Sequence, residues 1–347
     1  MKISRSAEPV RWLFVGFAFV FAACSVGLSP HEASKPDAAA ASDPLPSWNN
    51  TAEKTAIVDF VRNTTTIGSA DFVPPAERIA VFDDDGTLWL EQPAYVQFIY
   101  ALQRLQAMAP RHPGWRSEEP YRSALAGDMA SVLASNGEAN AMKLIMATHA
   151  GMSADQFAAD VHAWLLSARD KRFNRTYPEL VYEPMLEVLR YFRANDFKTF
   201  IVSGGGVEFM RGFAEHTYGI PPEQVIGSSI QYLYTTVDGQ PTLMRIGKLE
   251  NMDDGPGKPV TIQRVIGRKP IAAFGNSDGD LQMLEWTTSG KGARLGVIIH
   301  HTDAAREYAY DRTSKVGKLD KALDAAPSHG WIVVDMRHDW NRMFPGK

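Results

Sequence analysis

Short apolar runs alternate with amphipathic stretches along most of the chain. Continuous apolar runs, rather than alternating ones, are typical of parallel strands that are covered on both faces. Between them, stretches such as PMLEVLRYFRAN, with Pro184 near its start, predict helices. The alternation predicts an α/β fold with a doubly wound parallel sheet. The strand-like runs occupy residues 79–82, 198–203, 270–274, 296–299 and 331–334.

The longest interval between these runs, residues 89–182, has helical spacing throughout. AYVQFIYALQRL repeats apolar residues at that spacing, and SADQFAADVHAWLL opens with a capping box formed by Ser153 and Gln156. We therefore expect an inserted helical cap subdomain over about residues 89–182. A smaller insertion follows the second strand-like run, where Asp238 and Gly239 between β-prone segments predict a hairpin turn.

Composition places the chain in the globular class. It has 347 residues, of which 45% are hydrophobic, and a net charge of −4. A chain of this length buries a substantial core. The slightly acidic balance argues against nucleic acid as a partner, because nucleic-acid binding relies on basic patches.

The N-terminus has the pattern of a secretory signal. Three basic residues precede WLFVGFAFVFAA, which suits a signal peptide and is short for a membrane span of about twenty residues. The small residues before Cys24 resemble the bacterial lipobox, in which the cysteine is acylated. An ordinary signal peptide with an incidental cysteine is the alternative. The lipoprotein is favoured because Cys24 is the single cysteine and stands where the apolar run stops.

This pattern divides the chain into a signal peptide at residues 1–24, a flexible tether at 25–50 and a folded domain at 51–347. The tether is rich in Ala, Ser, Pro and Asp and shows no periodicity. The lipobox resemblance implies export to the periplasm and contact with the membrane only through the lipid anchor. Ser25, after the cysteine, is compatible with sorting to the outer membrane.

The stretch FDDDGTL places three aspartates at the end of the first strand. Asp83 and Asp85 stand two apart, so in extended backbone both face one pocket while Asp84 points elsewhere. Gly86 permits a tight exit, and Thr87 adds a hydroxyl. Two converging carboxylates raise each other's pKa, a problem that a hard divalent cation such as Mg²⁺ removes. The alternative is an acidic turn in solvent.

DDDGTL after an apolar strand resembles motif I of the haloacid dehalogenase superfamily. Three further segments are similar to the later motifs of this superfamily and follow in the same order along the chain: IVSGGG, GPGKPVTIQRVIG and AAFGNSDGDLQML. Together they span most of the region from residue 79 to 284. The resemblance implies a Rossmann-like core of the haloacid dehalogenase type and Mg²⁺-dependent phosphoryl transfer.

The resemblance also implies roles for single residues. Asp83 would be the nucleophile and a metal ligand, and Asp85 the general acid and base, with its backbone carbonyl on the metal. The phosphoryl group would be bound by Thr87, Ser203, Gly204 and Lys258. Lys248 and Lys269 are the rival lysines. Lys258 is preferred because glycines flank it and a helical stretch then leads into the fourth motif.

The fourth motif departs from the superfamily pattern. It reads GNSDGD, with Asn276 where an aspartate that binds the metal is expected. An asparagine carbonyl ligates Mg²⁺ but supplies no charge. The third metal ligand therefore stays open among Asn276, Asp278 and Asp280.

The arrangement of the insertions is similar to the phosphoserine phosphatase-like branch. In that branch a glutamate on the cap side reads the substrate, a position that falls on Glu91 or Gln92 here. Trp89 either stacks on a substrate or packs the cap, and packing is favoured. His300 and His301, at another strand end, are candidates for the rim of the site, against the alternative of surface polar residues.

The predicted function is a Mg²⁺-dependent phosphomonoesterase that acts on a small phosphorylated metabolite through an aspartyl phosphate. The alternative is a lipoprotein that binds a phosphorylated ligand without catalysis, which the asparagine in the fourth motif keeps open. Dehalogenase chemistry is disfavoured, because the dehalogenases of this superfamily lack the second acidic residue of motif I. That residue is present here as Asp85.

Overall fold

The computed structural model describes residues 43–132 and 136–346. The predicted signal peptide, Cys24 and the tether up to residue 42 lie outside them and stay predictions. Residues 43–50, which we expected to belong to the tether, are packed on the domain instead. Leu45 and Trp48 are buried, and the Ser47 amide donates to Glu187 at 2.9 Å. None of the helices described is long and apolar enough to cross a bilayer.

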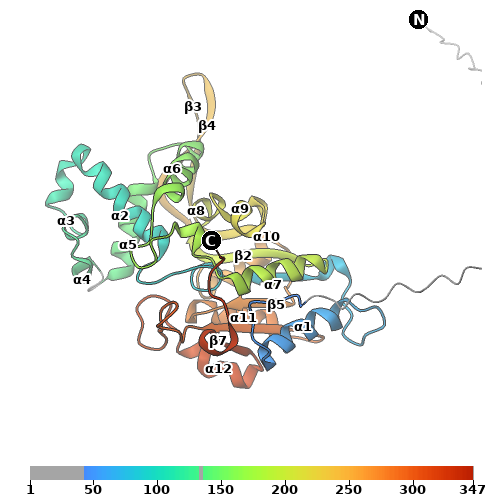
Figure 1. Cartoon of the computed structure of the whole chain (residues 1–347). Helices are drawn as coiled ribbons and strands as arrows, with labels where there is room; N and C mark the ends of the chain where they lie inside the picture. The colour runs from blue at the N-terminus through green and yellow to red at the C-terminus, as the bar shows by residue number, and fades with distance from the viewer. Residues whose placement is uncertain (1–42, 133–135, 347) are drawn as a thin grey trace, which may run out of the picture. The chain divides into compact units, whose positions relative to one another are not determined.

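Seven strands form one sheet in the order β4-β3-β2-β1-β5-β6-β7 (Figure 1). All neighbours are parallel except β3 and β4, which form an antiparallel hairpin at the edge. The predicted parallel α/β fold is therefore confirmed. The strands are β1 (Ile79–Phe82), β2 (Lys198–Gly206), β3 (Val225–Val237), β4 (Gln240–Asn251), β5 (Ala272–Gly275), β6 (Leu295–His300) and β7 (Ile332–Asp335).

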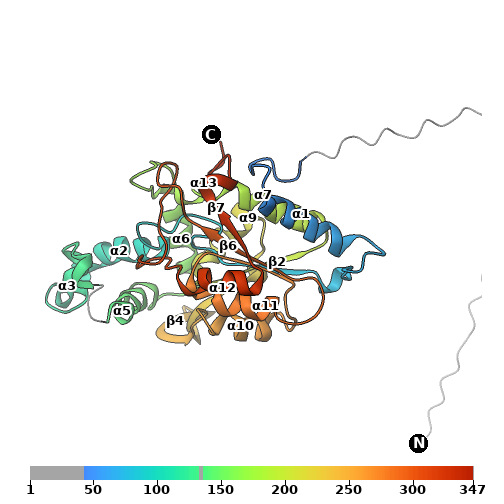
Figure 2. The same cartoon turned by 90° about the horizontal axis from the view of Figure 1, so that it is seen from below.

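Helices cover both faces of the sheet, and Figure 2 shows α10, α11 and α12 on one side with α1 and α7 on the other. Successive strand residues alternate between two cores, as the period of a strand requires. Ala80 and Phe82 belong to one core, and Val81 to the second. The helices around the sheet are α1 (Ala52–Thr65), α7 (Glu183–Ala194), α8 (Val207–Arg211), α9 (Ala214–Tyr218), α10 (Gly257–Val265), α11 (Leu281–Thr288), α12 (Lys321–His329) and α13 (Met336–Asp339).

The segment between β1 and α7 carries a further group of helices. Its α6 begins with the predicted capping box of Ser153 and Gln156. The group has its own apolar cluster, which includes Phe98, Leu105 and Leu144. Its helices are α2 (Val96–Met108), α3 (Tyr121–Leu125), α4 (Met129–Val132), α5 (Gly137–His149) and α6 (Ala154–Ser167).

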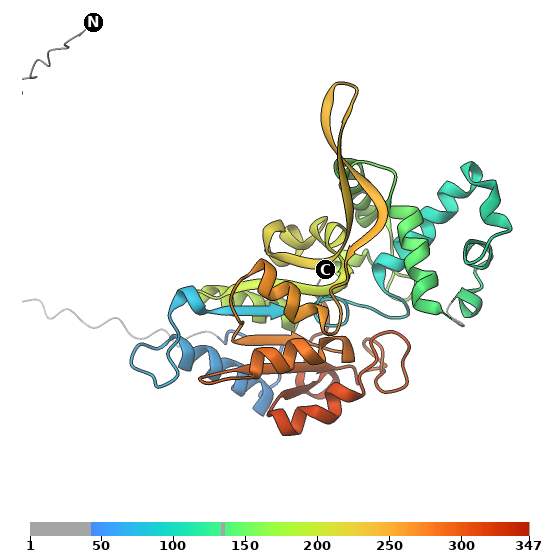
Figure 3. The same ribbon diagram turned by 180° about the vertical axis from the view of Figure 1, so that it is seen from behind.

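The β3–β4 hairpin extends beside these helices (Figure 3). Its turn is at Asp238 and Gly239, as predicted, and both residues have positive φ. The connection between α5 and α6 pairs with β4: the Arg245 amide donates to Met152 O at 2.8 Å, and the Gly151 amide to Arg245 O at 2.9 Å. The sheet edge and the helical insertion are thus directly hydrogen-bonded.

Short 3-10 turns complete the described structure. They connect the longer elements and occupy Pro75–Glu77, Ala109–Arg111, Pro113–Arg116, Tyr177–Glu179, Pro222–Gln224 and Asp278–Asp280.

Candidate active site

Asp83 stands at the carboxyl end of the central strand. Its backbone amide still bonds to the neighbouring strand, donating to Phe274 O at 2.9 Å. Its side chain accepts a hydrogen bond from Lys258 Nζ at 2.8 Å, and the same ammonium donates to Asp280 Oδ1 at 2.5 Å. All three side chains are buried. One buried cation is therefore shared between two carboxylates, as the motif order predicted for Lys258.

Burial and charge both act on the ionisation of this triad. Burial, followed by the nearby charge of Asp280, raises the pKa of Asp83 to about 7, against the opposing effect of Lys258. Burial alone would lower the pKa of Lys258, but Asp280 and Asp83 raise it, so the ammonium stays charged. A carboxylate beside a fixed cation is suited to attack an electrophile near neutral pH.

Asp85 lies beyond the strand end and is held by Trp89. The Trp89 indole donates to Asp85 Oδ1 at 2.8 Å while its ring stacks on Phe213, with centroids 4.3 Å apart. Burial raises the pKa of Asp85 to about 6, although the Trp89 hydrogen bond and the charge of Lys258 act the other way. A group with such a pKa exchanges protons readily near neutral pH.

Asp84 points away from these two carboxylates, but into the core rather than into solvent. Its Oδ1 accepts a hydrogen bond from the Tyr218 hydroxyl of α9 at 2.8 Å. Burial above all, followed by the charge of Asp85, raises the pKa of Asp84 well above its ordinary value. Asp84 therefore anchors the turn after β1, a role that its alternation with Asp83 and Asp85 did not reveal.

Gly86 allows the chain to turn where space is smallest. Its φ is +74°, and a Cβ there would lie 2.1 Å from Asn276 Nδ2 and 2.5 Å from Glu91 Oε1. Its carbonyl accepts a hydrogen bond from His301 Nε2 at 2.8 Å. Only glycine satisfies both the conformation and the contact.

The end of β2, residues 203–206, approaches Asp85 from beside β1, where its pairing with β3 is irregular. The Ser203 hydroxyl is buried and accepts a hydrogen bond from the Gly205 amide at 3.3 Å. A Cβ built on Gly205 would be 3.7 Å from Asp85 Oδ2, so this backbone runs beside the acid. Gly204, next to Ser203, is exposed.

Asn276 lies on the other side of Gly86. Its Oδ1 accepts from the Thr87 hydroxyl at 3.2 Å, and its Nδ2 donates to Glu91 Oε1 at 2.7 Å. The same Glu91 oxygen accepts from the Tyr310 hydroxyl at 2.8 Å. Burial raises the pKa of Glu91 well above its ordinary value, against these hydrogen bonds.

These positions follow the order of a known family. The sequence profile of the haloacid dehalogenase-like hydrolases matches residues 80–285, which is more than half of the chain. The chain belongs to the haloacid dehalogenase-like hydrolase family.

Solved structures with a similar fold have low sequence identity to this chain. A conserved protein of unknown function from Anaerococcus prevotii DSM 20548 is 15% identical, with a TM-score of 0.50, and the match covers 72% of this chain and 86% of that one. A protein of unknown function from Bordetella pertussis Tohama I is 16% identical, with a TM-score of 0.48 over 75% and 99% of the two chains. A probable phosphoserine phosphatase from Vibrio cholerae is 15% identical, with a TM-score of 0.36 over 75% and 68%. No curated protein sequence matches the chain significantly.

In this haloacid dehalogenase-like hydrolase, the acidic residues of the fourth motif have separate tasks. Asp278 Oδ1 accepts from the backbone amides of Asp320 and Ala322, at 2.9 and 3.0 Å, and so caps α12. Asp280 binds Lys258 with one oxygen and the amides of Asn276 and Ser277 with the other. Both aspartates are candidates with Asn276 for the third metal ligand, and in this structure their carboxylates bond to backbone amides and Lys258, while the Asn276 oxygen accepts from Thr87.

The donors around Asp83 fit a hard cation. Within residues 43–132 and 136–346, no three His, Cys, Asp or Glu side chains converge as a metal site. A site there would instead combine the Asp83 carboxylate with the Asp85 backbone carbonyl and the Asn276 amide oxygen. Buried acids gather in this region around one lysine, and a divalent cation would offset their excess negative charge.

The three residues considered for substrate contact are engaged elsewhere. Trp89 is buried against Phe213, as the packing alternative predicted. Glu91 faces Asn276 under the turn. Gln92 donates to Ser314 Oγ and Val316 O, at 3.2 and 3.0 Å, and so holds the segment after β6.

The two histidines differ in their surroundings. His301 is buried and binds the Gly86 carbonyl with Nε2, while its Nδ1 lies 3.3 Å from Glu307 Oε2. Tyr310 stacks on its ring with centroids 4.3 Å apart. His300 is half-buried, with Nε2 3.5 Å from Asp311 Oδ2. His301 thus supports the turn from beneath rather than lining a rim. The adjacent HH in the sequence was the only signal for it.

Proposed function

We propose that the protein is a Mg²⁺-dependent phosphomonoesterase that forms an aspartyl phosphate on Asp83. The observation that carries this proposal is the shared ion pair. Lys258 bonds Asp83 Oδ1, and Asp83 Oδ2 has no hydrogen-bond donor among the described residues. A second acid, Asp85, stands two residues further on, where proton transfer to a leaving group is needed.

Each residue has a defined task in this reaction. The free oxygen of Asp83 attacks phosphorus in line as the bond to the leaving oxygen breaks, and Asp85 gives that oxygen a proton. Water then attacks the phosphorus of the aspartyl phosphate, Asp85 takes its proton, and Asp83 is released with inorganic phosphate. Lys258 offsets the charge that gathers between phosphate and carboxylate, and Ser203 with the Gly204 amide binds phosphoryl oxygens.

Trp89 sets the direction of the proton donor. Its indole occupies Asp85 Oδ1, so the other oxygen, beside Gly205, is the one left for proton transfer. Bound Mg²⁺, held by Asp83, the Asp85 carbonyl and Asn276, would polarise the phosphoryl group and neutralise its charge.

The test is hydrolysis of p-nitrophenyl phosphate by the purified domain from Asp43 onward, with Mg²⁺ or with EDTA. We expect turnover with Mg²⁺ that EDTA removes, and a loss on the order of 10³-fold in kcat for Asp83→Asn. Asp238→Asn, at the exposed hairpin turn, is the matched control and should keep full activity. Metal-independent turnover, or full activity in Asp83→Asn, would overturn the proposal. Phosphate binding without any turnover would favour the non-catalytic alternative, which Asn276 keeps open because it brings no charge to the metal.

We further propose that the enzyme acts in the periplasm and is held at the membrane by a lipid anchor on Cys24, as the N-terminal pattern implies. Fatty-acid labelling of the expressed full-length chain should mark the wild type, and the label should be absent from Cys24→Ala. Equal labelling of the two would exclude the anchor.

A further inference from the structure

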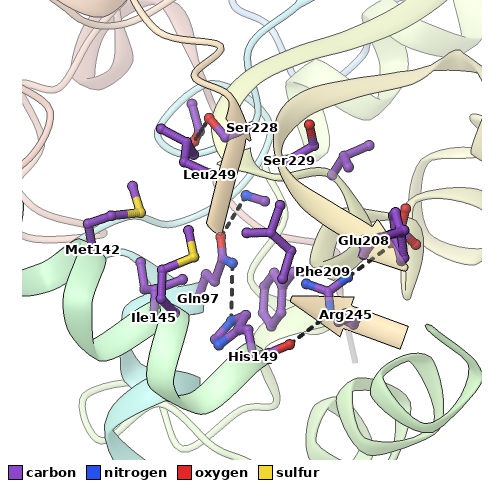
Figure 4. Close-up of a pocket in the computed structure, with 16 residues that line it drawn as sticks. Gln97, Met142, Ile145, His149, Glu208, Phe209, Ser228, Ser229, Arg245 and Leu249 are labelled. Carbon is purple, nitrogen blue, oxygen red and sulfur yellow. Dashed lines mark hydrogen bonds between the residues drawn. The ribbon is translucent and has the colours of Figure 1, made fainter. Parts of the chain in front are cut away.

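A pocket lies between the helical insertion and the sheet edge, next to the end of β2 (Figure 4). It is open to solvent, and about 520 Å³ of atom-free space lies within its outline, open solvent included. Its walls are largely apolar, because α5, α8 and the two hairpin strands turn hydrophobic side chains toward it. They include Met142, Ile145, Met146, Phe209, Ile230 and Leu249.

The pocket adjoins the proposed site of phosphoryl transfer through the end of β2, residues 203–206. Gly204 and Gly206 line the pocket. Between them, Gly205 runs beside Asp85, with a Cβ position 3.7 Å from Asp85 Oδ2. A phosphoryl group bound at Ser203 and Gly204 would therefore have its leaving group at the entrance of this pocket.

Most polar groups on the pocket wall are already bonded to the protein; Glu208, the one carboxylate among the lining residues, accepts from Arg211 NH1 at 2.7 Å. Gln97 Oε1 accepts from the Gly206 amide at 2.7 Å, and its Nε2 lies 3.2 Å from His149 Nε2. The other His149 nitrogen, Nδ1, is 2.9 Å from Thr148 Oγ1. Ser228 Oγ donates to Gly204 O at 2.9 Å and accepts from the Asp253 amide at 3.0 Å.

The one buried cation of the wall is also engaged. Arg245 donates from Nε to His149 O at 2.8 Å and from NH1 to the Tyr232 hydroxyl at 3.2 Å. Its guanidinium lies over the Phe157 ring, 3.9 Å from the centroid. Burial, with the charges of Arg245 and Arg104, lowers the pKa of His149 to about 3, so this imidazole adds no charge.

We propose that this pocket binds the leaving alcohol of the substrate, and that this alcohol is uncharged and largely apolar, such as an aryl or branched alkyl group. The inference rests on the proposed phosphatase function and gives it a substrate class. An ammonium group would lose water here and would compete with Arg211 for Glu208, and several hydroxyls would face a mostly apolar wall, so both cost affinity. Apolar atoms gain by burial against the methionines and Ile145.

Binding of non-hydrolysable phosphonates tests the pocket independently of turnover. The full-length chain with Mg²⁺ is titrated by calorimetry with benzylphosphonate, 2-aminoethylphosphonate and 3-phosphonopropionate. We expect benzylphosphonate to bind at least about tenfold more tightly than the other two, the discrimination that apolar pockets provide. Equal or tighter binding of the amino compound, or no binding of benzylphosphonate, would overturn the proposal. Tighter binding of the carboxylated compound would also overturn it, and would show that Arg245 reads an anion.

A substitution that changes polarity at nearly constant length places the effect in this pocket. Met146→Gln should weaken benzylphosphonate about fivefold or more and leave 2-aminoethylphosphonate unchanged. Met108→Gln, half-buried on α2 and outside the pocket, is the matched control and should change neither. Unchanged benzylphosphonate affinity in Met146→Gln would overturn the assignment.

Turnover separates failure of this inference from failure of the proposed function. If the chain hydrolyses phenyl phosphate with a higher kcat/KM than phosphoserine or glycerol 2-phosphate, both stand. If it hydrolyses the polar esters better, the proposed phosphatase function is supported and the proposed apolar substrate class is wrong. If no ester is hydrolysed while benzylphosphonate binds as described, the pocket stands and the catalytic function falls.

Discussion

At the scale of single residues, Asn276 distinguishes this site from the motif it resembles. Its amide gives one hydrogen bond to Glu91 and accepts one from Thr87. An aspartate at this position would have no proton to give to Glu91. The asparagine of the fourth motif is thus linked to a second, buried carboxyl, that of Glu91, which the sequence suggested only as a candidate for substrate contact.

We expect Asn276→Asp to destabilise the metal-free protein by about 2 kcal/mol, because it puts two carboxyls in contact and removes one of the two donors to Glu91, leaving only Tyr310. Mg²⁺ should offset that repulsion, so the rise in melting temperature on adding Mg²⁺ should be larger than for the wild type. Thermal unfolding with and without Mg²⁺ measures it.

The double variant Asn276→Asp with Glu91→Gln is the matched control. It restores a donor opposite the new carboxylate, so the metal-free protein should recover most of its stability. An equal response to Mg²⁺ in Asn276→Asp and the wild type would show that this position does not face the cation.

The order of the motifs identified the residues that meet around Lys258, because each motif has a recognisable position relative to the end of a predicted strand. It could not identify Tyr218, which binds Asp84 from α9, because a buried tyrosine in a helix has the same pattern whether or not it is bonded. The role of His301 was equally inaccessible, because it depends on a carbonyl 215 positions away along the chain.

At the scale of elements, the turn after β1 holds the site together through Gly86. Comparison of two glycines with similar φ angles separates the cost of a left-handed conformation from the cost of steric contact. Gly86 has φ +74° with Asn276 and Glu91 against it, whereas Gly239 has φ +78° and no atom within 4 Å of a Cβ position.

Gly239→Ala should lower the free energy of unfolding by about 1 kcal/mol, the cost of a left-handed conformation. Gly86→Ala should cost about 3 kcal/mol or more, because overpacking against Asn276 adds to that strain. Urea unfolding of both variants compares them. Equal losses would mean that the turn yields without disturbing Asn276.

Strands β1, β2, β5, β6 and β7 were predictable because each contains a continuous apolar run, and β1 matches its predicted bounds at residues 79–82. The start of β3, which pairs with β2, was not predicted, because β3 and β4 carried only the signal of a hairpin. The segment between β6 and α12 was not predicted either. It has little regular structure, yet Tyr310, Gln92's partners and Glu307 all come from this region and close the underside of the site. Irregular backbone has no periodicity, so sequence pattern cannot place it.

At the scale of the whole domain, the insertion and the core meet at His149. The ring is buried at the end of α5 and bonded through Gln97 to Gly206 of the core. Its pKa of about 3 lies below the ordinary value of 6.5. In the unfolded chain, His149 therefore binds a proton below about pH 6.5. In the folded protein it binds that proton only at about pH 3.

This group's contribution to stability is complete above pH 6.5 and is lost as the pH falls toward 3. Between pH 7 and 5 the loss should be about 2 kcal/mol, at about 1.4 kcal/mol per pH unit below 6.5. In His149→Gln the decrease over that range should be smaller by this amount, as measured by urea unfolding at both values.

His329→Gln, at an exposed position on α12, is the control and should keep the wild-type dependence on pH. A wild-type dependence in His149→Gln as well would show that this ring does not resist protonation.

The boundary of the folded domain shows where composition misleads. Residues 43–50 share the composition of the predicted tether, but Leu45 and Trp48 fill the core beside α7 and α13. Two apolar side chains are enough to dock a Pro- and Ser-rich segment when the fold offers a complementary surface. That surface is formed by residues more than a hundred positions away in the sequence, so local composition does not reveal it.

The last ladder hydrogen bond of the central strand belongs to Asp83 itself, whose amide reaches Phe274 O. Asp85, two positions on, has left the ladder and depends on Trp89 and the turn at Gly86. The proposed nucleophile is thus fixed by the hydrogen bonds of the sheet, and the proposed proton donor by side chains and a turn outside it. In that mechanism, substitutions in the turn would alter proton transfer while the position of the nucleophile stays fixed.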